Sequence, residues 1–457
     1  MRAILIIGRI EKGAVLGLSF LGLRRQALRA LFLAALLLPP LARAAESDQR
    51  EIARDDEIIE LKRKLDVVVT ELETLRTQVA APEVPTALES QYGLGPAASK
   101  IYSVARGVSI GGYAEGFYRR SNAGSDDIWD MTRVVAYLGY KFNDWIVFNT
   151  ELEFEHGSTE NEGSVSVEFA TLDFLLMPEL NVRMGEVLIP MGIVNEFHEP
   201  PFYYSTFRPT PERVIIPSTW RENGLGLFGS LGERLSYRVY VVNGFLASDY
   251  SSAGLRGGRQ NGSEAIANDL AVVGRVDFDV IEGMRLGGSY YVGNAGQDQS
   301  IDVGGTDFGV PDARTTVWEV HGEYRWQGLT TRALWTQAHV ADAGSLSGLL
   351  SLSGADDPVV SRRMIGGYGE LAYDVIPLFF PGSEMSLEPF FRFEYVDTQN
   401  DVPSGFVADR AFKQRLYVPG IQWKPIPNVV LKLDYRKIDD FANTNEDEVS
   451  LGFGLIF

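Results

Sequence analysis

The chain has 457 residues, 45% of them hydrophobic and 23% charged, and its formal net charge at pH 7 is −19. So negative a protein is not a non-specific nucleic-acid binder, because phosphate binding needs clustered Lys and Arg. There is no cysteine, and no window after the N-terminal region has the roughly 18 apolar residues of a membrane helix. The length fits either two or three soluble domains or one large barrel.

Residues 1–44 have the features of a signal peptide. Three arginines between residues 24 and 29 precede an apolar run over residues 30–38, which is too short to act as a membrane anchor. Residues 42–44 read Ala-Arg-Ala, a small-residue cleavage site. We therefore expect export of the chain and removal of residues 1–44.

Residues 45–80 show the apolar repeat of a coiled coil, with spacings that alternate between three and four. The repeat consists of Ile58, Leu61, Leu65, Val68, Leu72, Leu75 and Val79. We expect a short periplasmic coiled coil, stabilised by a larger body that holds the chains together. A single amphipathic helix lying on its own protein would show the same spacing. Residues 81–107 contain three prolines and little periodicity, which predicts a flexible linker.

From residue 108 to residue 457, runs of about ten alternating residues are separated by turns. Sixteen runs start near Val108, Met131, Trp145, Ser164, Asn181, Gly224, Leu235, Leu270, Met284, Thr315, Leu329, Met364, Met385, Ala411, Val429 and Glu448. Short connections alternate with long polar ones, except for the longer apolar link over residues 375–384. This pattern predicts an all-β transmembrane fold, a 16-stranded antiparallel outer-membrane β-barrel. A β-propeller would instead show a blade repeat of about forty to fifty residues, which we do not find.

Several runs place apolar and charged residues on opposite faces. Because Arg or Lys at mid-bilayer costs about 2–4 kcal/mol, the charged face must point inward, and sixteen strands leave room for a water-filled channel. The predicted lumen-lining residues are Arg133, Glu151, Glu153, Arg183, Arg238, Arg285, Arg392, Lys432 and Arg436. Their mixed signs predict no strong ion preference, and these charges could simply neutralise one another.

The longest connection, residues 191–223, carries six aromatic residues and five prolines. Such a segment should fold against something, and the lumen of a wide barrel is available. Charges on an inward-folded loop would lie beside the permeating solute and help to set selectivity. The predicted constriction residues are Arg208, Arg213, Arg221, Glu196, Glu199 and His198. Any of them could instead brace the loop, as Arg213 would by pairing with a carboxylate near Glu212.

Residues 181–244 resemble the phosphate-selective porin O/P family. The resemblance is carried by Asn181-Val182-Arg183-Met184-Gly185-Glu186, Pro190-Met191-Gly192, Glu212-Arg213, Arg221-Glu222-Asn223-Gly224-Leu225-Gly226 and Tyr240-Val241-Val242-Asn243-Gly244. The heptad segment is also similar to that of the DcaP-like porins, which are trimers with an N-terminal periplasmic coiled coil. The resemblance implies a homotrimer of sixteen-stranded barrels whose third loop folds into the lumen. Members of the phosphate-selective family line their path with lysine and an arginine ladder, whereas this barrel has five lysines and none in the third loop.

The last ten residues form the clearest strand. One face carries Val449, Leu451, Phe453, Leu455 and Phe457, and the other carries Ser450, Gly452 and Gly454. This is the pattern of a strand that is apolar outward and small inward. A soluble antiparallel sheet could show the same alternation. The final phenylalanine resembles the signal read by the outer-membrane assembly machinery.

These features predict a bacterial outer-membrane porin for passive diffusion of small hydrophilic solutes, with a preference for anions set by the three loop arginines. Expected partners are outer-membrane lipid and lipopolysaccharide, and no cofactor, metal or nucleic acid is expected. The alternative is a barrel that acts as a tether through its coiled coil, although about 34 helical residues reach only about 50 Å. A hydrolase is not favoured, since the chain has four histidines, no Gly-x-Ser-x-Gly elbow and no His pair at metal spacing.

Overall fold

The computed structural model describes residues 58–71, 90–122, 126–157, 163–444 and 446–457. The chain divides into two compact units, Met1–Arg76 and Thr77–Phe457. In the first unit, residues 58–71 form a helix whose apolar side chains are exposed. The coiled coil over residues 45–80 stays a prediction, because residues 45–57 and 72–80 lie outside the described residues, as does the signal peptide 1–44.

None of the helices in the described part of the chain combines the length and the apolar character that crossing a membrane requires.

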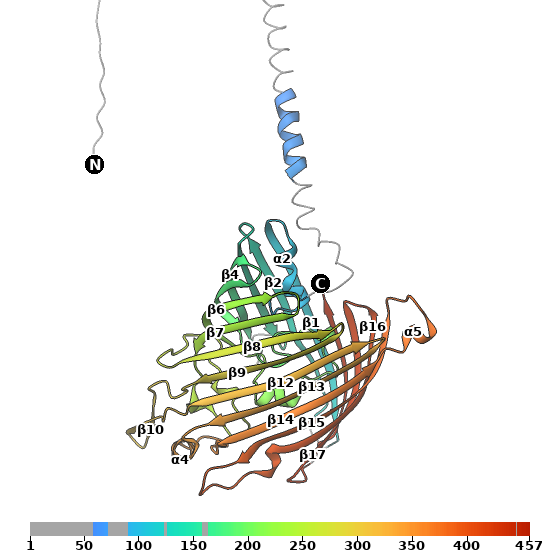
Figure 1. Cartoon of the computed structure of the whole chain (residues 1–457). Coiled ribbons are helices and arrows are strands. Elements are labelled where there is room, and N and C mark those ends of the chain that lie inside the picture. The colour runs from blue at the N-terminus through green and yellow to red at the C-terminus, as the bar shows by residue number, and fades with distance from the viewer. Residues whose placement is uncertain (1–57, 72–89, 123–125, 158–162, 445) are drawn as a thin grey trace, which may run out of the picture. The chain divides into compact units, whose positions relative to one another are not determined.

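Sixteen of the described strands pair into one closed antiparallel barrel (Figure 1). These strands are β1 (Gly107–Ser121), β2 (Ile128–Lys141), β3 (Ile146–Glu155), β4 (Val165–Met177), β5 (Leu180–Leu188), β6 (Arg221–Leu231), β7 (Leu235–Asn243), β8 (Leu270–Ile281), β9 (Met284–Gly293), β12 (Thr315–Trp326), β13 (Leu329–Val340), β14 (Arg363–Tyr373), β15 (Ser386–Asp401), β16 (Lys413–Ile426), β17 (Val429–Asp440) and β18 (Glu448–Ile456). Each pairs with its neighbours in sequence, and β1 closes the ring against β18 in a register that sets Tyr113 opposite Ile456. The predicted sixteen-stranded barrel is confirmed.

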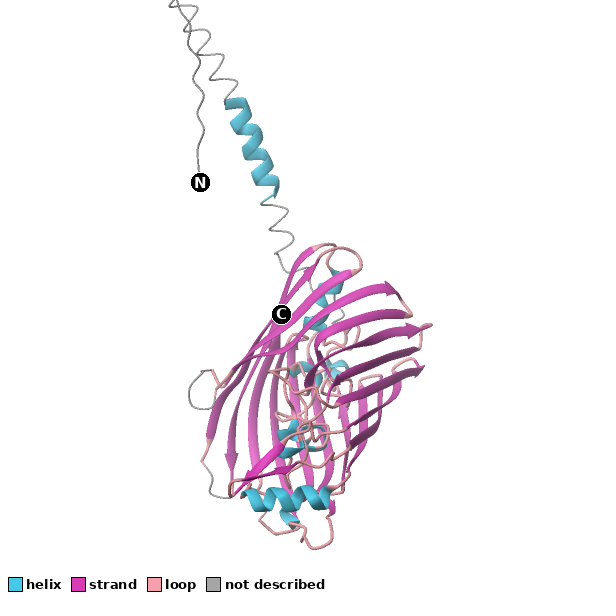
Figure 2. Ribbon diagram, turned by 90° about the vertical axis from the view of Figure 1, so that its left-hand side faces the viewer, coloured by secondary structure: helices cyan, strands magenta, loops and turns pink. Residues whose placement is uncertain are grey.

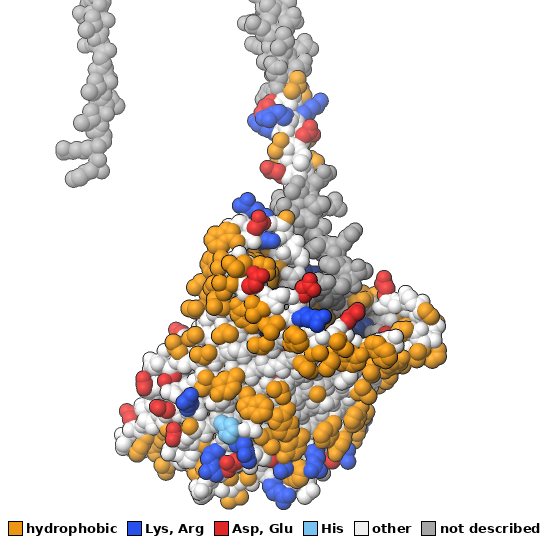
Figure 3. Space-filling view, viewed as in Figure 1, with side chains coloured by type: hydrophobic (Ala, Val, Ile, Leu, Met, Phe, Trp, Pro, Cys, Tyr) orange, Lys and Arg blue, Asp and Glu red, His pale blue; other side chains and the backbone are white. Residues whose placement is uncertain are grey.

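Alternate side chains face opposite sides of the barrel wall. In β18, Val449 and Leu451 are exposed, whereas Ser450 between them is buried. Apolar side chains gather on the outer wall in Figure 3. On the inner side, charged residues such as Glu151 and Glu153 are buried. The wall is therefore apolar outside and polar inside, which is the arrangement that the alternating runs predict.

Short turns alternate with long connections around the ring. The long connections carry most of the remaining elements, which are η1 (Pro200–Phe202), α3 (Thr210–Val214), η2 (Ala247–Asp249), η3 (Arg256–Gly258), the hairpin β10 (Ser300–Val303) and β11 (Thr306–Gly309), α4 (Ala343–Ser353) and η4 (Arg410–Phe412). One connection on the short-turn side is longer and contains α5 (Ile376–Phe379), whose Leu378 and Phe379 are exposed. It is the apolar link that stood out in the sequence.

Helix α2 (Pro96–Ser103) lies against the inner wall and contacts β1, β2 and β3. Its Ala97, Ala98 and Ile101 are buried in one apolar cluster with wall residues such as Tyr137. The predicted linker over residues 81–107 thus contains a folded and buried helix. The reason for the difference is that α2 has only eight residues, too few for a helical period to stand out from the prolines and glycines around it.

The long connections form a second apolar cluster inside the ring, which we call the loop core. Figure 2 shows loops and short helices within the ring of strands. The loop core combines Ile215, Ile216 and Trp220 of the third loop with Phe245, Tyr291, Leu346 and Leu350 from later segments. Trp220 stacks on Phe245 with ring centroids 4.5 Å apart. Apolar packing therefore fills the lumen beside β5, β7 to β9 and β12 to β15, the strands that contribute wall residues to the loop core.

Candidate functional site

Cations on the inner wall hold the third loop, residues 189–220, in the lumen. Arg392 on β15 donates to the backbone carbonyls of Tyr204, at 3.1 Å, and Phe207, at 3.0 Å. It is fully buried, and it also pairs with Glu394 at 2.8 Å and Glu370 at 3.3 Å. The guanidinium group of Arg392 is therefore engaged in holding the third loop in place and is not free to contact a solute.

Lys432 on β17 has a similar role. Its Nζ donates to the carbonyls of Tyr203 and Ser205, each at 2.9 Å, and lies 3.6 Å from the centre of the Tyr203 ring. Cation–π contact and hydrogen bonds together compensate for the burial of an ammonium group. The loop backbone is thus tied to β17 as well as to β15.

Wall and loop carboxylates complete the attachment. Glu212 in α3 accepts from the Tyr368 hydroxyl at 2.6 Å and from the backbone N–H of Val194 at 2.7 Å. Burial raises the pKa of Glu212. Glu394 accepts from the backbone N–H of Thr210 at 2.6 Å. The loop is consequently folded inward along its length.

Four of the six predicted constriction residues have partners that brace the structure. Glu196 pairs with Arg238 at 3.0 Å and with Arg275 at 3.4 Å. Burial, partly offset by these arginines, raises the pKa of Glu196. Arg221 pairs with Glu168 and Glu186, each at 3.2 Å. The charges of Glu196 and Arg221 are neutralised by neighbours that lie far away in sequence.

Glu199 joins the third loop to α2. Its carboxylate accepts from the backbone N–H groups of Ala97, at 3.0 Å, and Ala98, at 3.3 Å. These are orphan donors of the first helical turn, so Glu199 caps α2 from outside the helix. Burial raises the pKa of Glu199 to about 7, although the two backbone hydrogen bonds act in the opposite direction. The fourth residue, His198, lies between Glu151 and Glu168 on the wall.

The other two predicted constriction residues, Arg208 and Arg213, line a cavity of about 140 Å³. Its wall side is formed by parts of β1, β2, β17 and β18, which lie away from the loop core. Its charged lining residues are Arg133, Arg208, Arg213, Arg256 and Lys432, with Glu115 as the carboxylate. Positive charge therefore dominates this part of the lumen.

Four of these cations lack a carboxylate partner among the described residues, and one of them, Lys432, is held instead by carbonyls of the third loop. Within the described residues, Arg208, Arg213 and Arg256 form no ion pair, and Nη2 of Arg208 is buried without a hydrogen-bond partner. Arg256 donates to the carbonyl of Ser218. Burial, followed by the neighbouring Arg259, Arg208 and Arg213, lowers the pKa of Arg256 to about 9. A group with this pKa keeps its charge at neutral pH. We call Arg208, Arg213 and Arg256 the free arginines.

The predicted lumen-lining residues lie on the strands, and every arginine among them pairs with a carboxylate. The pairs are Arg133 with Glu115 and Glu153, Arg183 with Asp173, Arg238 with Asp277, Arg285 with Asp279, Arg392 with Glu370 and Glu394, and Arg436 with Glu448. Lys432 has the carbonyl partners described above, and Glu151 faces His198. Mutual neutralisation, one of the two interpretations that the sequence allowed, describes these wall pairs.

Sequence reasoning missed Arg256 and α2. Arg256 belongs to a Gly-rich stretch between β7 and β8, and no local pattern distinguishes it from an exposed loop arginine. The signal that could have identified α2 is the Pro at its first position, which is typical of a helix start.

The closed ring with inward-folded connections defines a β-barrel protein with a polar, largely filled lumen. A protein of Aquifex aeolicus (strain VF5), described as uncharacterized, is 36% identical over 386 residues, which cover 82% of this chain and 85% of that protein. The chain belongs to the same family as this Aquifex protein. No protein-family model matches the chain.

Two solved structures are similar to the barrel at low identity. OmpTdeltaL8, a loop deletion mutant of an outer membrane protein of Vibrio cholerae, has a TM-score of 0.50 and 13% identity, covering 78% of this chain and 100% of that chain. OmpF of Salmonella typhi in complex with daunomycin has a TM-score of 0.49 and 14% identity, covering 77% of this chain and 98% of that one. At such identities the likeness concerns the fold alone.

Proposed function

We propose that the protein is an outer-membrane porin, a passive channel for small hydrophilic solutes that prefers anions. The observation that carries this proposal is the set of free arginines in a cavity between the third loop and the wall. Selectivity in such channels comes from pore diameter and from the charges at the narrowest point. Since the wall arginines are paired with carboxylates and Lys432 is held by loop carbonyls, the free arginines would decide the sign of the preference.

The outer surface supports insertion in an outer membrane. Aromatic side chains are enriched at both interfaces of membrane barrels. Trp145, Trp326 and Trp423 are exposed, and each lies at or near a short turn. The short turns would face the periplasm, because bacterial outer-membrane barrels have short periplasmic turns and longer outer loops. The coiled coil over residues 45–80 would then extend into the periplasm of a Gram-negative-type bacterium.

The guanidinium groups of the free arginines indicate which class of solute the channel would favour. A guanidinium presents planar N–H donors that match the oxygens of carboxylate and phosphate groups. Conduction requires contacts that are weak enough to release the solute. Three cations on flexible stems in a hydrated cavity meet that requirement better than a closed binding pocket. We infer small organic or inorganic anions as the favoured solutes, and a homotrimer with lipid and lipopolysaccharide as its surroundings.

The test is single-channel recording of the purified full chain in planar lipid bilayers. We expect conductance steps in groups of three and a reversal potential of anion-selective sign under a KCl gradient. Replacing all three free arginines, Arg208→Gln, Arg213→Gln and Arg256→Gln, should lower the anion-to-cation permeability ratio by roughly fivefold or more. The reason is that a unit charge about 4 Å away contributes on the order of 1 kcal/mol even in water.

The matched control is the double variant Arg285→Gln and Asp279→Asn, which removes both members of a wall ion pair at 2.7 Å and so leaves the net charge unchanged. It should leave the permeability ratio near the wild-type value. An unchanged ratio in the triple variant would assign the free arginines to bracing the loop. A barrel that folds but does not conduct would favour the tether, the alternative function.

A further inference from the structure

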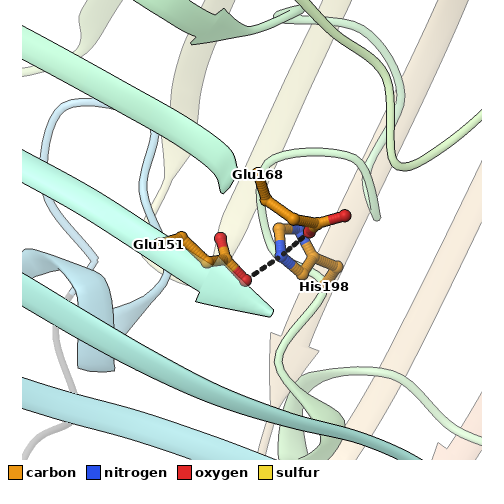
Figure 4. A group of neighbouring side chains, drawn as sticks. All are labelled: Glu151, Glu168 and His198. Atoms are coloured by element: carbon orange, nitrogen blue, oxygen red, sulfur yellow. Dashed lines mark hydrogen bonds and ion pairs between the residues drawn. The ribbon is translucent and has the colours of Figure 1, made fainter. Parts of the chain in front are cut away.

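Glu151, Glu168 and His198 converge on one point inside the barrel (Figure 4). Glu151 lies on β3, Glu168 on β4, and His198 comes from the third loop. The three side chains expose 0%, 1% and 2% of their surface. Their nearest ligand atoms all lie within 4.8 Å of one another. The cluster is separate from the cavity of the free arginines.

A β-bulge brings the two carboxylates to the same side of the wall. In the pairing of β3 with β4, Glu151 lies opposite Phe169 while Leu152 lies opposite Val167, so Glu168 is the extra residue. A bulge of this kind re-aims a side chain that regular alternation would place differently. Here it turns Glu168 inward, beside Glu151 and below the loop.

The two ring nitrogens of His198 have different neighbours, a backbone carbonyl at Nδ1 and the Glu151 carboxylate at Nε2. Its Nδ1 lies 2.9 Å from the backbone carbonyl of Asn195. Because a carbonyl only accepts, we assign the proton to Nδ1. The lone pair of Nε2 then points toward Glu151 and Glu168. This is the arrangement of a metal-binding histidine, whose second nitrogen commonly donates to a carbonyl group.

The distances from His198 to the two carboxylates agree better with three ligands of one metal ion than with direct ion pairs. Nε2 of His198 lies 3.3 Å from Oε1 of Glu151 and 3.5 Å from Oε2 of Glu168. Charge-assisted hydrogen bonds are shorter, about 2.7–2.9 Å. Two ligands bound to one ion at about 2.1 Å in tetrahedral geometry are about 3.4 Å apart. Within the described residues, Oε2 of Glu151 and Oε2 of Glu168 are buried without a hydrogen-bond partner.

Neighbouring side chains orient the carboxylate of Glu168, and the three proposed ligands balance the charge of a bound cation. Oε1 of Glu168 accepts from the Thr219 hydroxyl at 2.7 Å and from Arg221 at 3.2 Å, which leaves Oε2 to face His198. The neighbouring Glu153 is paired with Arg133 at 2.8 Å. Two carboxylates and one neutral imidazole would compensate the charge of a divalent cation in full.

We propose that Glu151, Glu168 and His198 form a binding site for a divalent transition-metal ion, with Zn²⁺ as the best match. One imidazole and two carboxylates are a ligand set that Zn²⁺ accepts, whereas Mg²⁺ and Ca²⁺ prefer oxygen ligands alone. The ion would cross-link the third loop to β3 and β4. Since Glu199, the next residue, caps α2, the same bond would also fix the position of that helix.

The test is zinc binding by the purified full chain in detergent. After incubation with ZnCl₂ and removal of free metal, elemental analysis should give about one zinc per chain. EDTA should lower the temperature of unfolding, because a ligand that binds only the folded state stabilises it. Co²⁺ in place of Zn²⁺ should give the visible absorption of a low-coordinate site with nitrogen and oxygen ligands.

Three variants test the assignment of the ligands. His198→Ala, Glu151→Gln and Glu168→Gln should each lose the bound zinc and the effect of EDTA, and the two Gln variants keep the shape of the side chain in case His198→Ala does not fold. The control is His156→Ala, whose side chain pairs with Asp130 at 2.9 Å and is partly exposed. It should retain the zinc. Wild-type protein that holds no more zinc than Glu151→Gln, with an unfolding temperature unaffected by EDTA, would overturn the proposal.

Discussion

The arginines of the lumen differ in whether a carboxylate lies beside them, and this difference separates Arg392 from Arg208. Arg392 lies beside Glu370 and Glu394, and its remaining donors hold backbone carbonyls of the third loop. Arg208 has no ion pair among the described residues, although it is only a short distance along the loop from those carbonyls. The first arginine is engaged in holding the fold, and the second is the one to which the proposed function gives contact with a solute.

This difference predicts unequal losses of stability. Arg392→Met leaves the buried Glu394 without an ion pair and leaves Glu370 only Arg332, at 3.7 Å, and removal of one partner of a buried ion pair costs about 3–5 kcal/mol. Arg208→Met removes no ion pair and should cost about 1 kcal/mol, as an average substitution does. The measurement is urea unfolding of the barrel refolded in lipid vesicles. Equal losses in the two variants would contradict the distinction.

The sequence identified some of the site residues but not their partners. It placed Arg208 and Arg213 on an inward-folded loop because of their position in an aromatic, proline-rich connection. It could not show that Glu196 and Arg221 are neutralised, since Arg238 and Glu168 become their neighbours only when the ring closes. It gave no indication of a metal site either, because the proposed ligands are far apart in the chain and follow no spacing motif.

The barrel strands were easier to predict from the sequence than the short helix α2. A barrel strand shows an alternation that its own residues define, so the runs beginning near residues 108, 235 and 448 correspond closely to β1, β7 and β18. Helix α2 has no side-chain cap of its own. Its cap is Glu199, about a hundred residues later in the chain, so its stability depends on tertiary contacts that no local pattern contains.

Helix α2 packs closely on the barrel wall where Ile101 lies against Gly139 of β2. A Cβ atom at Gly139 would lie 2.7 Å from the Ile101 side chain, so Gly139→Val should push α2 away from β2. We expect faster protease cleavage after Lys100 and a higher single-channel conductance. Gly369→Val is the matched control, because a Cβ at Gly369 would meet nothing within 4 Å. A cleavage rate equal to that of the control would show that α2 does not depend on this contact.

The lumen of the barrel has one side filled by apolar packing and another side lined by charged residues. The loop core fills the region beside β5, β7 to β9 and β12 to β15, while the free arginines face β1, β2, β17 and β18. The third loop contributes to both, with Ile215 and Ile216 in the loop core and Arg208 and Arg213 in the cavity. One segment thus sets both how much space remains and what charge surrounds it.

Shortening that segment should change the whole channel. Removal of residues 196–216 takes away the obstruction and two free arginines together, so conductance should rise and anion preference should fall in the same recordings. Removal of residues 302–307 is the control, because it trims the tip of the β10–β11 hairpin, where a Cβ atom at Gly304 or Gly305 would meet nothing within 4 Å. A rise in conductance with unchanged selectivity would assign the preference to charges outside the third loop.

The position of α2 also bears on how the molecule is assembled. Helix α2 precedes β1 in the chain and packs on it, whereas the seam between β1 and β18 joins strands from opposite ends of the barrel sequence. Contacts between near neighbours form before distant ones, because less chain entropy is lost in making them. We therefore expect the helix to reach its place while the sheet is still open, so that the ring closes around contents that are already there.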